Sequence, residues 1–220
     1  MTRPFPASRA ARRLALALLL LVPPVLAAGQ APAQTAPAAP AASDPALMGP
    51  LAPFLPMGTG ADGWAGRLDG NAYVLENGKA GAVKYVYAGK AGGPSGPRTL
   101  SVAVKVQAAG APGDSAAGLL YGLVPGPSYY AFVLNGERQV VLFRRSPGGF
   151  ERMLAVGGDM VGGADTVTLG ITEKDGAIAL SLNGREIAAL SQSGTGTGEA
   201  GIIALGAGAF RFAGFRNQTP

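Results

Sequence analysis

The sequence predicts an all-β sandwich or barrel for the folded part of the chain, and three observations lead to this prediction. Short apolar segments alternate apolar and polar residues with a period of two, which is the pattern of strands that bury one face. Asn-Gly and Asp-Gly dipeptides separate several of these segments, as in tight hairpins. Glycine accounts for 35 of the 220 residues, about twice its usual ~7% share, without forming a repeat.

The strands can be placed in order along the chain. The alternation is clearest in Leu100–Gln107, Asp165–Thr172 and Ala177–Leu182, where Val, Leu and Ile occupy every second position. Eight further strands are expected at Asn71–Leu75, Val83–Tyr87, Gly118–Gly122, Tyr129–Leu134, Gln139–Arg144, Arg185–Ala189, Ile202–Leu205 and Ala209–Phe215. Hairpin turns are expected at Asp69-Gly70, Asn77-Gly78, Asn135-Gly136, Asp175-Gly176 and Asn183-Gly184, because these residues accept positive φ. About eleven strands with turns every 8–12 residues are typical of a sandwich or barrel.

Residues 1–28 have the pattern of a secretory signal peptide. An apolar run from Leu14 to Val22 leads to the small residues that end at Ala27, and four arginines precede it: Arg3, Arg9, Arg12 and Arg13. The run is shorter than the roughly 20 apolar residues that span a bilayer. We therefore expect cleavage after Ala27 or Ala28 and a periplasmic or secreted protein with no membrane span after cleavage. The alternative is an uncleaved anchor.

Residues 29–49 are rich in Ala and Pro and offer no apolar face. Such a segment is expected to be a disordered linker with polyproline character. The folded domain is then 50–217, which is long enough to bury about 70% of its unfolded surface in a single core. Because the chain has no cysteine, this core must hold the fold without disulfides.

Composition excludes several classes of function. The net charge of +5 is largely due to the leader, because without its four arginines 14 basic residues stand against 13 acidic ones. No nucleic-acid partner is expected, since that would need clustered Lys and Arg in the folded domain. The chain has neither histidine nor cysteine, which excludes Ser-His-Asp and Cys-His nucleophiles and the usual zinc sites.

The order of the later segments resembles the concanavalin A-like lectin/glucanase superfamily. The resemblance lies in the Tyr-rich pair Gly118–Gly122 and Tyr129–Leu134, the hairpin Leu182-Asn-Gly184, and a closing strand Phe210-x-Phe-x-x-Phe215. The similarity is greatest to its laminin G-like members and to domains labelled 3-keto-disaccharide hydrolase. It implies a jelly-roll β-sandwich of two antiparallel sheets, one of them concave. It does not carry a catalytic signature.

No catalytic residue and no metal site is predicted. Glycoside hydrolysis uses two nearby carboxyl groups, and no two acidic residues here lie two or four apart within a predicted strand. The motif Gly58-x-Gly60-x-x-Gly63 is expected to be a loop, because no helix follows to bind a dinucleotide. No cofactor is expected. Asp114, Asp159 and Asp165 lie in glycine-rich loops that suit calcium without fixing a ligand set, so calcium binding stays open.

The central strands suggest a ligand site. If Asn135-Gly136 closes a two-residue hairpin, Tyr130, Phe132 and Leu134 share a core face with Gln139, Val141 and Phe143. The opposite face then mixes tyrosine with arginine and is partly wet. Because sugars are held by aromatic faces beside polar groups, four residues are candidates for ligand binding: Tyr121, Tyr129, Arg144 and Lys105. The alternative is that the tyrosines cap the core and the basic residues are simply solvated. Trp64 is expected to pack rather than bind.

Two main hypotheses follow, with a third beside them. The first is an exported, non-catalytic module that binds a carbohydrate or cell-envelope component. The second is a glycoside hydrolase-like enzyme of the 3-keto-disaccharide hydrolase type, which the resemblance alone suggests. The third is a structural envelope protein. The identity of the ligand and the oligomeric state stay open.

Overall fold

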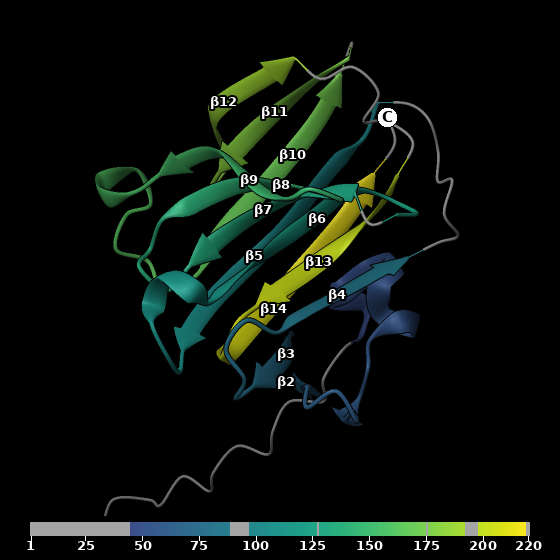
Figure 1. Ribbon diagram of the computed structural model, residues 1–220. Coiled ribbons are helices and arrows are strands. Elements are labelled where there is room, and N and C mark those ends of the chain that lie inside the picture. Colours follow the sequence, from purple (N-terminus) through teal and green to yellow (C-terminus); the bar gives the residue numbers. More distant parts are fainter. Residues whose placement is uncertain (1–44, 89–96, 127, 175, 192–197, 219–220) are drawn as a thin grey trace, which may run out of the picture. The chain divides into compact units, whose positions relative to one another are not determined.

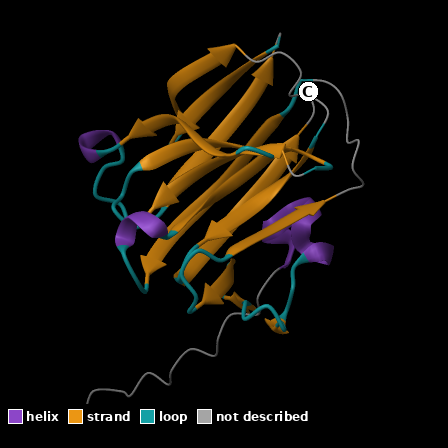
Figure 2. Cartoon of the chain, viewed as in Figure 1, coloured by secondary structure: helices purple, strands orange, loops and turns teal. Residues whose placement is uncertain are grey.

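The computed structural model describes residues 45–88, 97–126, 128–174, 176–191 and 198–218. Within them, two antiparallel β-sheets pack face to face, which confirms the predicted all-β sandwich (Figures 1 and 2). The expected signal peptide and residues 29–44 of the expected linker lie outside the described residues. None of the helices formed by the described residues is long and apolar enough to cross a membrane.

Each sheet is antiparallel throughout. The eight-stranded sheet has the order β1 (Gly58–Thr59), β2 (Ala65–Asp69), β3 (Ala72–Asn77), β14 (Gly208–Gln218), β5 (Thr99–Ala108), β10 (Val167–Lys174), β11 (Ala177–Leu182) and β12 (Arg185–Ser191). The six-stranded sheet has the order β4 (Val83–Ala88), β13 (Glu199–Leu205), β6 (Ala116–Val124), β7 (Ser128–Asn135), β8 (Val140–Ser146) and β9 (Gly149–Val156). The described residues also form three 3-10 helices: η1 (Pro45–Phe54) before the first strand, and η2 (Pro112–Asp114) and η3 (Gly158–Met160) between strands of different sheets.

The period-two pattern determines the inner faces, as predicted. Leu100, Val102 and Val104 of β5 are fully buried between the sheets, and they alternate with more exposed residues. The predicted Asn183-Gly184 turn is confirmed, because Leu182 pairs with Arg185 and both turn residues have positive φ (51° and 80°). The strands β1, β2 and β9 were not predicted, because β1 and β2 are short and β9 carries charges on an exposed edge.

The core lies between the sheets and also includes the N-terminal 3-10 helix. Trp64 is buried and its ring centroid lies 5.9 Å from that of Phe210, so it packs in the core as expected. Met48, which the sequence analysis placed in the linker, is 1% exposed and belongs to the same cluster as Leu51. The packed part of the chain therefore begins before residue 50.

The predicted register between β7 and β8 is wrong. Leu134 pairs with Val140, so residues 135–139 form the turn instead of Asn135-Gly136 alone. The Asn135 side chain holds this longer turn, since its Oδ1 accepts a hydrogen bond from the Gln139 N–H at 2.8 Å, and Arg138 adopts a φ of 60°. An odd shift of register exchanges the two faces of a strand.

The side chains of β8 therefore lie on the faces opposite to those predicted. Tyr130, Phe132 and Leu134 do face the core, as expected, but their partners there are Val140 and Leu142. Val141 and Phe143, which were predicted to be core residues, belong instead to a second apolar cluster together with Tyr129, on the opposite face of the same sheet.

Candidate functional site

The outer face of the six-stranded sheet, which points away from the core, is apolar. Leu120 on β6, Ala131 and Val133 on β7, and Ile203 on β13 are all fully buried there. In a sandwich this face normally meets solvent and carries polar residues. These four residues form a floor that other side chains must cover.

Five aromatic side chains cover this floor and form what we term the aromatic row: Tyr87, Tyr85, Tyr129, Phe150 and Phe143. Successive ring centroids lie 6.0, 6.1, 6.3 and 6.3 Å apart, within the range of favourable aromatic pairs. Tyr85 and Tyr129 meet although β13 and β6 lie between their strands. Neighbouring strands are about 4.8 Å apart, so both rings lean inward over the strands between them.

The local sequence explains this arrangement. In β4, Val86 points into the core while Tyr85 and Tyr87 point outward. Opposite Tyr87, β13 carries Gly201, where a Cβ atom would lie 1.9 Å from the Val86 carbonyl oxygen. A side chain at this position is therefore excluded, which leaves room above the strand for the tyrosine rings.

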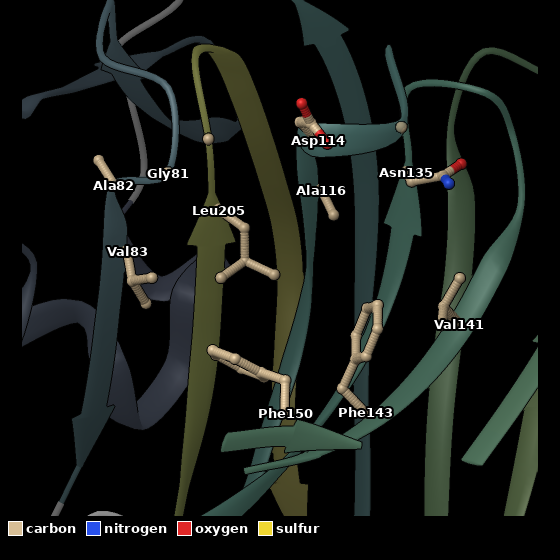
Figure 3. A pocket seen from close by; sticks show the side chains of 12 residues that line it. Gly81, Ala82, Val83, Asp114, Ala116, Asn135, Val141, Phe143, Phe150 and Leu205 are labelled. Atoms are coloured by element: carbon tan, nitrogen blue, oxygen red, sulfur yellow. The ribbon is translucent and has the colours of Figure 1, made fainter. Parts of the chain in front are cut away.

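One end of the outer face holds an apolar pocket of about 240 Å³. Val83, Leu205, Phe143 and Phe150 form its apolar wall, and Figure 3 shows the two phenylalanine rings side by side. Polar groups of Asp114, in η2, and Asn135, at the end of β7, lie across from these rings (Figure 3). The pocket thus combines aromatic surface with a few polar groups at one edge, as small-molecule sites do.

A second pocket, which we term the tyrosine pocket, has a volume of about 300 Å³. Its lining residues are Tyr85, Tyr87, Leu123, Val124, Pro125, Gly126 and Glu199. Glu199 is only 3% exposed, and burial raises the pKa of its carboxyl group while the positive charge of Arg98 opposes that rise. The lining of this pocket therefore includes an almost fully buried glutamate beside two tyrosines.

A positively charged side chain lies beside the aromatic row. The Arg145 guanidinium lies 4.9 Å from the ring centroid of Phe150, a cation–π geometry. Burial raises the pKa of the Tyr129 hydroxyl, and Arg145 partly offsets this. The tyrosine hydroxyl therefore stays protonated and can donate a hydrogen bond at neutral pH.

A buried ion pair lies between the two sheets. Arg98 Nε is 3.5 Å from Glu173 Oε2, and the same oxygen accepts a hydrogen bond from the Tyr121 hydroxyl at 2.6 Å. The guanidinium also lies 4.7 Å from the centre of the Tyr121 ring. Arg98 and Tyr121 are almost completely buried, so this cluster joins the two sheets by polar contacts.

The structure does not bring the four predicted ligand-binding residues together. Tyr129 belongs to the aromatic row. Tyr121 is buried in the core, and Lys105 lies on the eight-stranded sheet, where it pairs with Asp165 at 2.8 Å. Arg144 pairs with Tyr130 in the β7–β8 register, so it lies on the other face of β8 from Arg145. Whether any of the four binds a ligand stays a prediction.

Sequence reasoning missed most of the outer face. Tyr85 and Tyr87 alternate with Val86 in a predicted strand, so two tyrosines on one face were a readable signal. Phe143 was assigned to the wrong face, and Phe150 lies in a strand that was not predicted. Glu199 follows a glycine-rich stretch and gave no local signal at all.

The structure locates two other features of the sequence. In the motif Gly58-x-Gly60-x-x-Gly63, Gly58 lies in the short strand β1 and the rest forms a turn, in which the Gly60 N–H donates to the Trp64 carbonyl at 2.8 Å. Strand β2 follows this turn instead of a helix, as predicted. Among the described residues, no group of three or more acidic side chains lies close enough together to hold a metal ion.

Comparison with known proteins gives a likeness of fold. No family model matches the chain, and no curated protein matches it. Among solved structures, the carbohydrate binding module CBM66 from Bacillus subtilis has 11% identity and a TM-score of 0.56, covering 74% of this chain and all of its own. A functionally unknown protein from Saccharomyces cerevisiae has 12% identity and a TM-score of 0.54, over 71% of this chain and 92% of its own.

A third similar structure is the GH43 protein BlXynB from Bacillus licheniformis, with 13% identity and a TM-score of 0.56. The match covers 74% of this chain and 35% of that protein, so the chain corresponds to about a third of it. At these identities the three structures show the fold, which agrees with the lectin-like sandwich that the resemblance implied.

Proposed function

We propose that this protein is an exported, non-catalytic module that binds a carbohydrate of the cell envelope through the outer face of its six-stranded sheet. The observation that carries the proposal is the aromatic row, which covers an apolar floor and has a pocket toward each end of β4. Export to the periplasm or the medium rests on the expected signal peptide.

The chemistry of the face suits a sugar. A sugar ring presents apolar C–H faces, which pack on aromatic rings, and hydroxyl groups, which need fixed hydrogen-bonding partners. The row supplies the rings. Asp114 and Asn135 at the apolar pocket, Arg145 beside Phe150, and Glu199 in the tyrosine pocket supply polar groups. The likeness of fold to a carbohydrate-binding module supports the same proposal.

The test begins with an array of cell-envelope polysaccharides and continues with calorimetric titration of those that bind. Phe150→Ala is the informative variant, because its ring is 51% exposed and can be removed without opening the core. Phe54→Ala is the matched control, because that ring is 53% exposed and lies on η1, outside the row.

We expect Phe150→Ala to lower the affinity about tenfold or more, roughly 1.4 kcal/mol, and Phe54→Ala to leave it unchanged. Equal affinities in both variants, or no binding to any polysaccharide, would overturn the proposal. Release of a cleaved sugar during the titration would favour the enzyme instead. Retention of the protein in isolated envelopes without glycan binding would favour a structural role.

A further inference from the structure

Glu199 holds a buried carboxylate oxygen that has no hydrogen-bond partner among the described residues. The side chain is 3% exposed, and no described residue donates to its Oε1. Burying an unpaired charge is strongly unfavourable, and folded proteins leave few buried polar atoms unsatisfied. Such a group therefore calls for an explanation in terms of function or of strain.

The backbone around Glu199 fixes the direction of this side chain. Glu199 opens β13 opposite Leu123, and the register shifts both between Glu199 and Gly201 and along the neighbouring part of β6. Next to it, a Cβ atom at Gly198 would lie 2.3 Å from the Gly122 carbonyl carbon, so the two strands are in close contact. Bulges of this kind re-aim side chains, often next to functional sites, and here Glu199 is one of the residues that line the tyrosine pocket.

One guanidinium acts on two carboxylates. Arg98 Nε lies 3.5 Å from Glu173 Oε2 and its charge also acts on Glu199, but Nε and Nη2 have no hydrogen-bond partner among the described residues. The groups that face Glu199 are thus Arg98, with Glu173 beyond it, and the two tyrosines of β4. Glu173 and Glu199 together outnumber this one guanidinium, and Glu199 Oε1 has no donor among the described residues.

We propose that the Glu199 carboxylate accepts hydrogen bonds from hydroxyl groups of a neutral sugar unit that lies against Tyr85 and Tyr87 in the tyrosine pocket. This inference rests on the proposed carbohydrate binding and names the class of sugar. The pocket volume of about 300 Å³ is at the low end for small-molecule sites and suits one ring. A uronic acid is disfavoured, because its carboxylate would meet Glu199 and the excess negative charge around it.

Glu199→Gln separates this role from a structural one. The substitution keeps the shape of the side chain, but it removes the charge and turns half of the carboxylate into an amide donor. Because an unpaired buried charge destabilises the fold, we expect the midpoint of thermal unfolding to rise by roughly 2–4 °C, while sugar affinity falls about tenfold or more. A structural role predicts a lower midpoint instead. Glu186→Gln, on an exposed position of β12 in the other sheet, is the matched control.

The probes are methyl α-glucopyranoside, methyl β-galactopyranoside and methyl β-fructofuranoside, with glucuronic acid as the acidic counterpart. Each is titrated into the purified protein while NMR follows the tyrosine ring and Glu199 side-chain signals. We expect at least one neutral glycoside to shift the signals of Tyr85, Tyr87 and Glu199, glucuronic acid to shift none, and Glu199→Gln to lose the shifts while Glu186→Gln keeps them.

Three results would overturn the inference. Unchanged glycoside affinity in Glu199→Gln, with polysaccharide affinity still lowered in Phe150→Ala, overturns the role of Glu199 and leaves the proposed function standing. Glucuronic acid that binds as well as the neutral glycosides overturns the sugar class. If no glycoside and no envelope polysaccharide shifts any signal, the proposed function and this inference fall together.

Discussion

The two outer faces of the sandwich differ sharply, although the same alternation of residues builds both. The outer face of the eight-stranded sheet carries charges in oppositely charged pairs: Arg67–Glu76, Lys105–Asp165 and Arg211–Asp69. The outer face of the six-stranded sheet carries the aromatic row over an apolar floor. One face is an ordinary solvated surface, and the other keeps aromatic groups exposed.

This difference indicates where function lies. Exposed ion pairs contribute little to stability and keep a surface soluble, so the charged face needs no further explanation. Exposed aromatic groups gathered on one face are a liability unless something binds there. Four predictions test this contrast, and they follow in order of expected effect.

Phe132→Ala tests the inner side of the same sheet and has the largest expected effect. Phe132 is fully buried between the sheets, so its removal leaves a cavity and costs about 3–5 kcal/mol of unfolding free energy. Phe150→Ala, on the outer side, is expected to cost no more than about 1 kcal/mol. Denaturant titration of both variants measures the contrast. Similar losses would mean that the aromatic row is a second core rather than a binding surface.

The double variant Tyr85→Ala/Phe150→Ala removes the two rings that contact Tyr129. If the row binds sugar, the double variant is expected to lose about 100-fold in affinity, or roughly 2.7 kcal/mol, and calorimetry measures this directly. Its far-UV circular dichroism should match that of the unaltered protein, because both rings are partly exposed. An affinity within about twofold of the original would contradict the account.

The contribution of Glu199 to folding stability is expected to fall as the pH rises. Because its pKa is raised in the folded protein, the folded state holds this proton more tightly than the unfolded state does. The contribution of Glu199 to stability is therefore greatest below the unfolded pKa and is lost as the pH rises through the folded pKa. Glu199→Gln is expected to remove this part of the stability profile. A profile from pH 4 to 8 that is identical in both proteins would show that the carboxylate is not buried as described.

Lys105→Met tests the charged face and has the smallest expected effect. The ammonium group lowers the pKa of Asp165, so the pair contributes above the unfolded pKa of that carboxyl and its contribution is lost as the pH falls through the lower folded pKa. The variant is expected to lose a little resistance to acid and to keep its sugar affinity. A fall in affinity as large as that of Phe150→Ala would move the site to the other sheet.

The sequence predicted the fold better than the site, for a physical reason. The alternation in β5, β10 and β11 shows which residues point inward, and burial confirms these predictions except at Val106, which is only partly buried. It does not show which sheet a strand joins, so Lys105 and Tyr129 were grouped although they lie on different sheets.

Turn length is a second quantity that a local pattern does not give. Asn135-Gly136 suits a two-residue turn, but the Asn135 side chain stabilises a longer one and thereby reverses the faces of β8. Phe150 was missed because Pro147 and two glycines hide the start of β9. The aromatic row depends on contacts between strands that are distant in sequence, so Tyr129 alone among its members was a predicted ligand-binding residue.

The most direct test of the account is to map a bound envelope polysaccharide fragment by NMR transfer of magnetisation from sugar protons to the protein. If the sugar binds on the outer face of the six-stranded sheet, the signals of Tyr85, Tyr129 and Phe150 are expected to respond, whereas those of Lys105 and its neighbours on β5 are not. Responses confined to the eight-stranded sheet would contradict it.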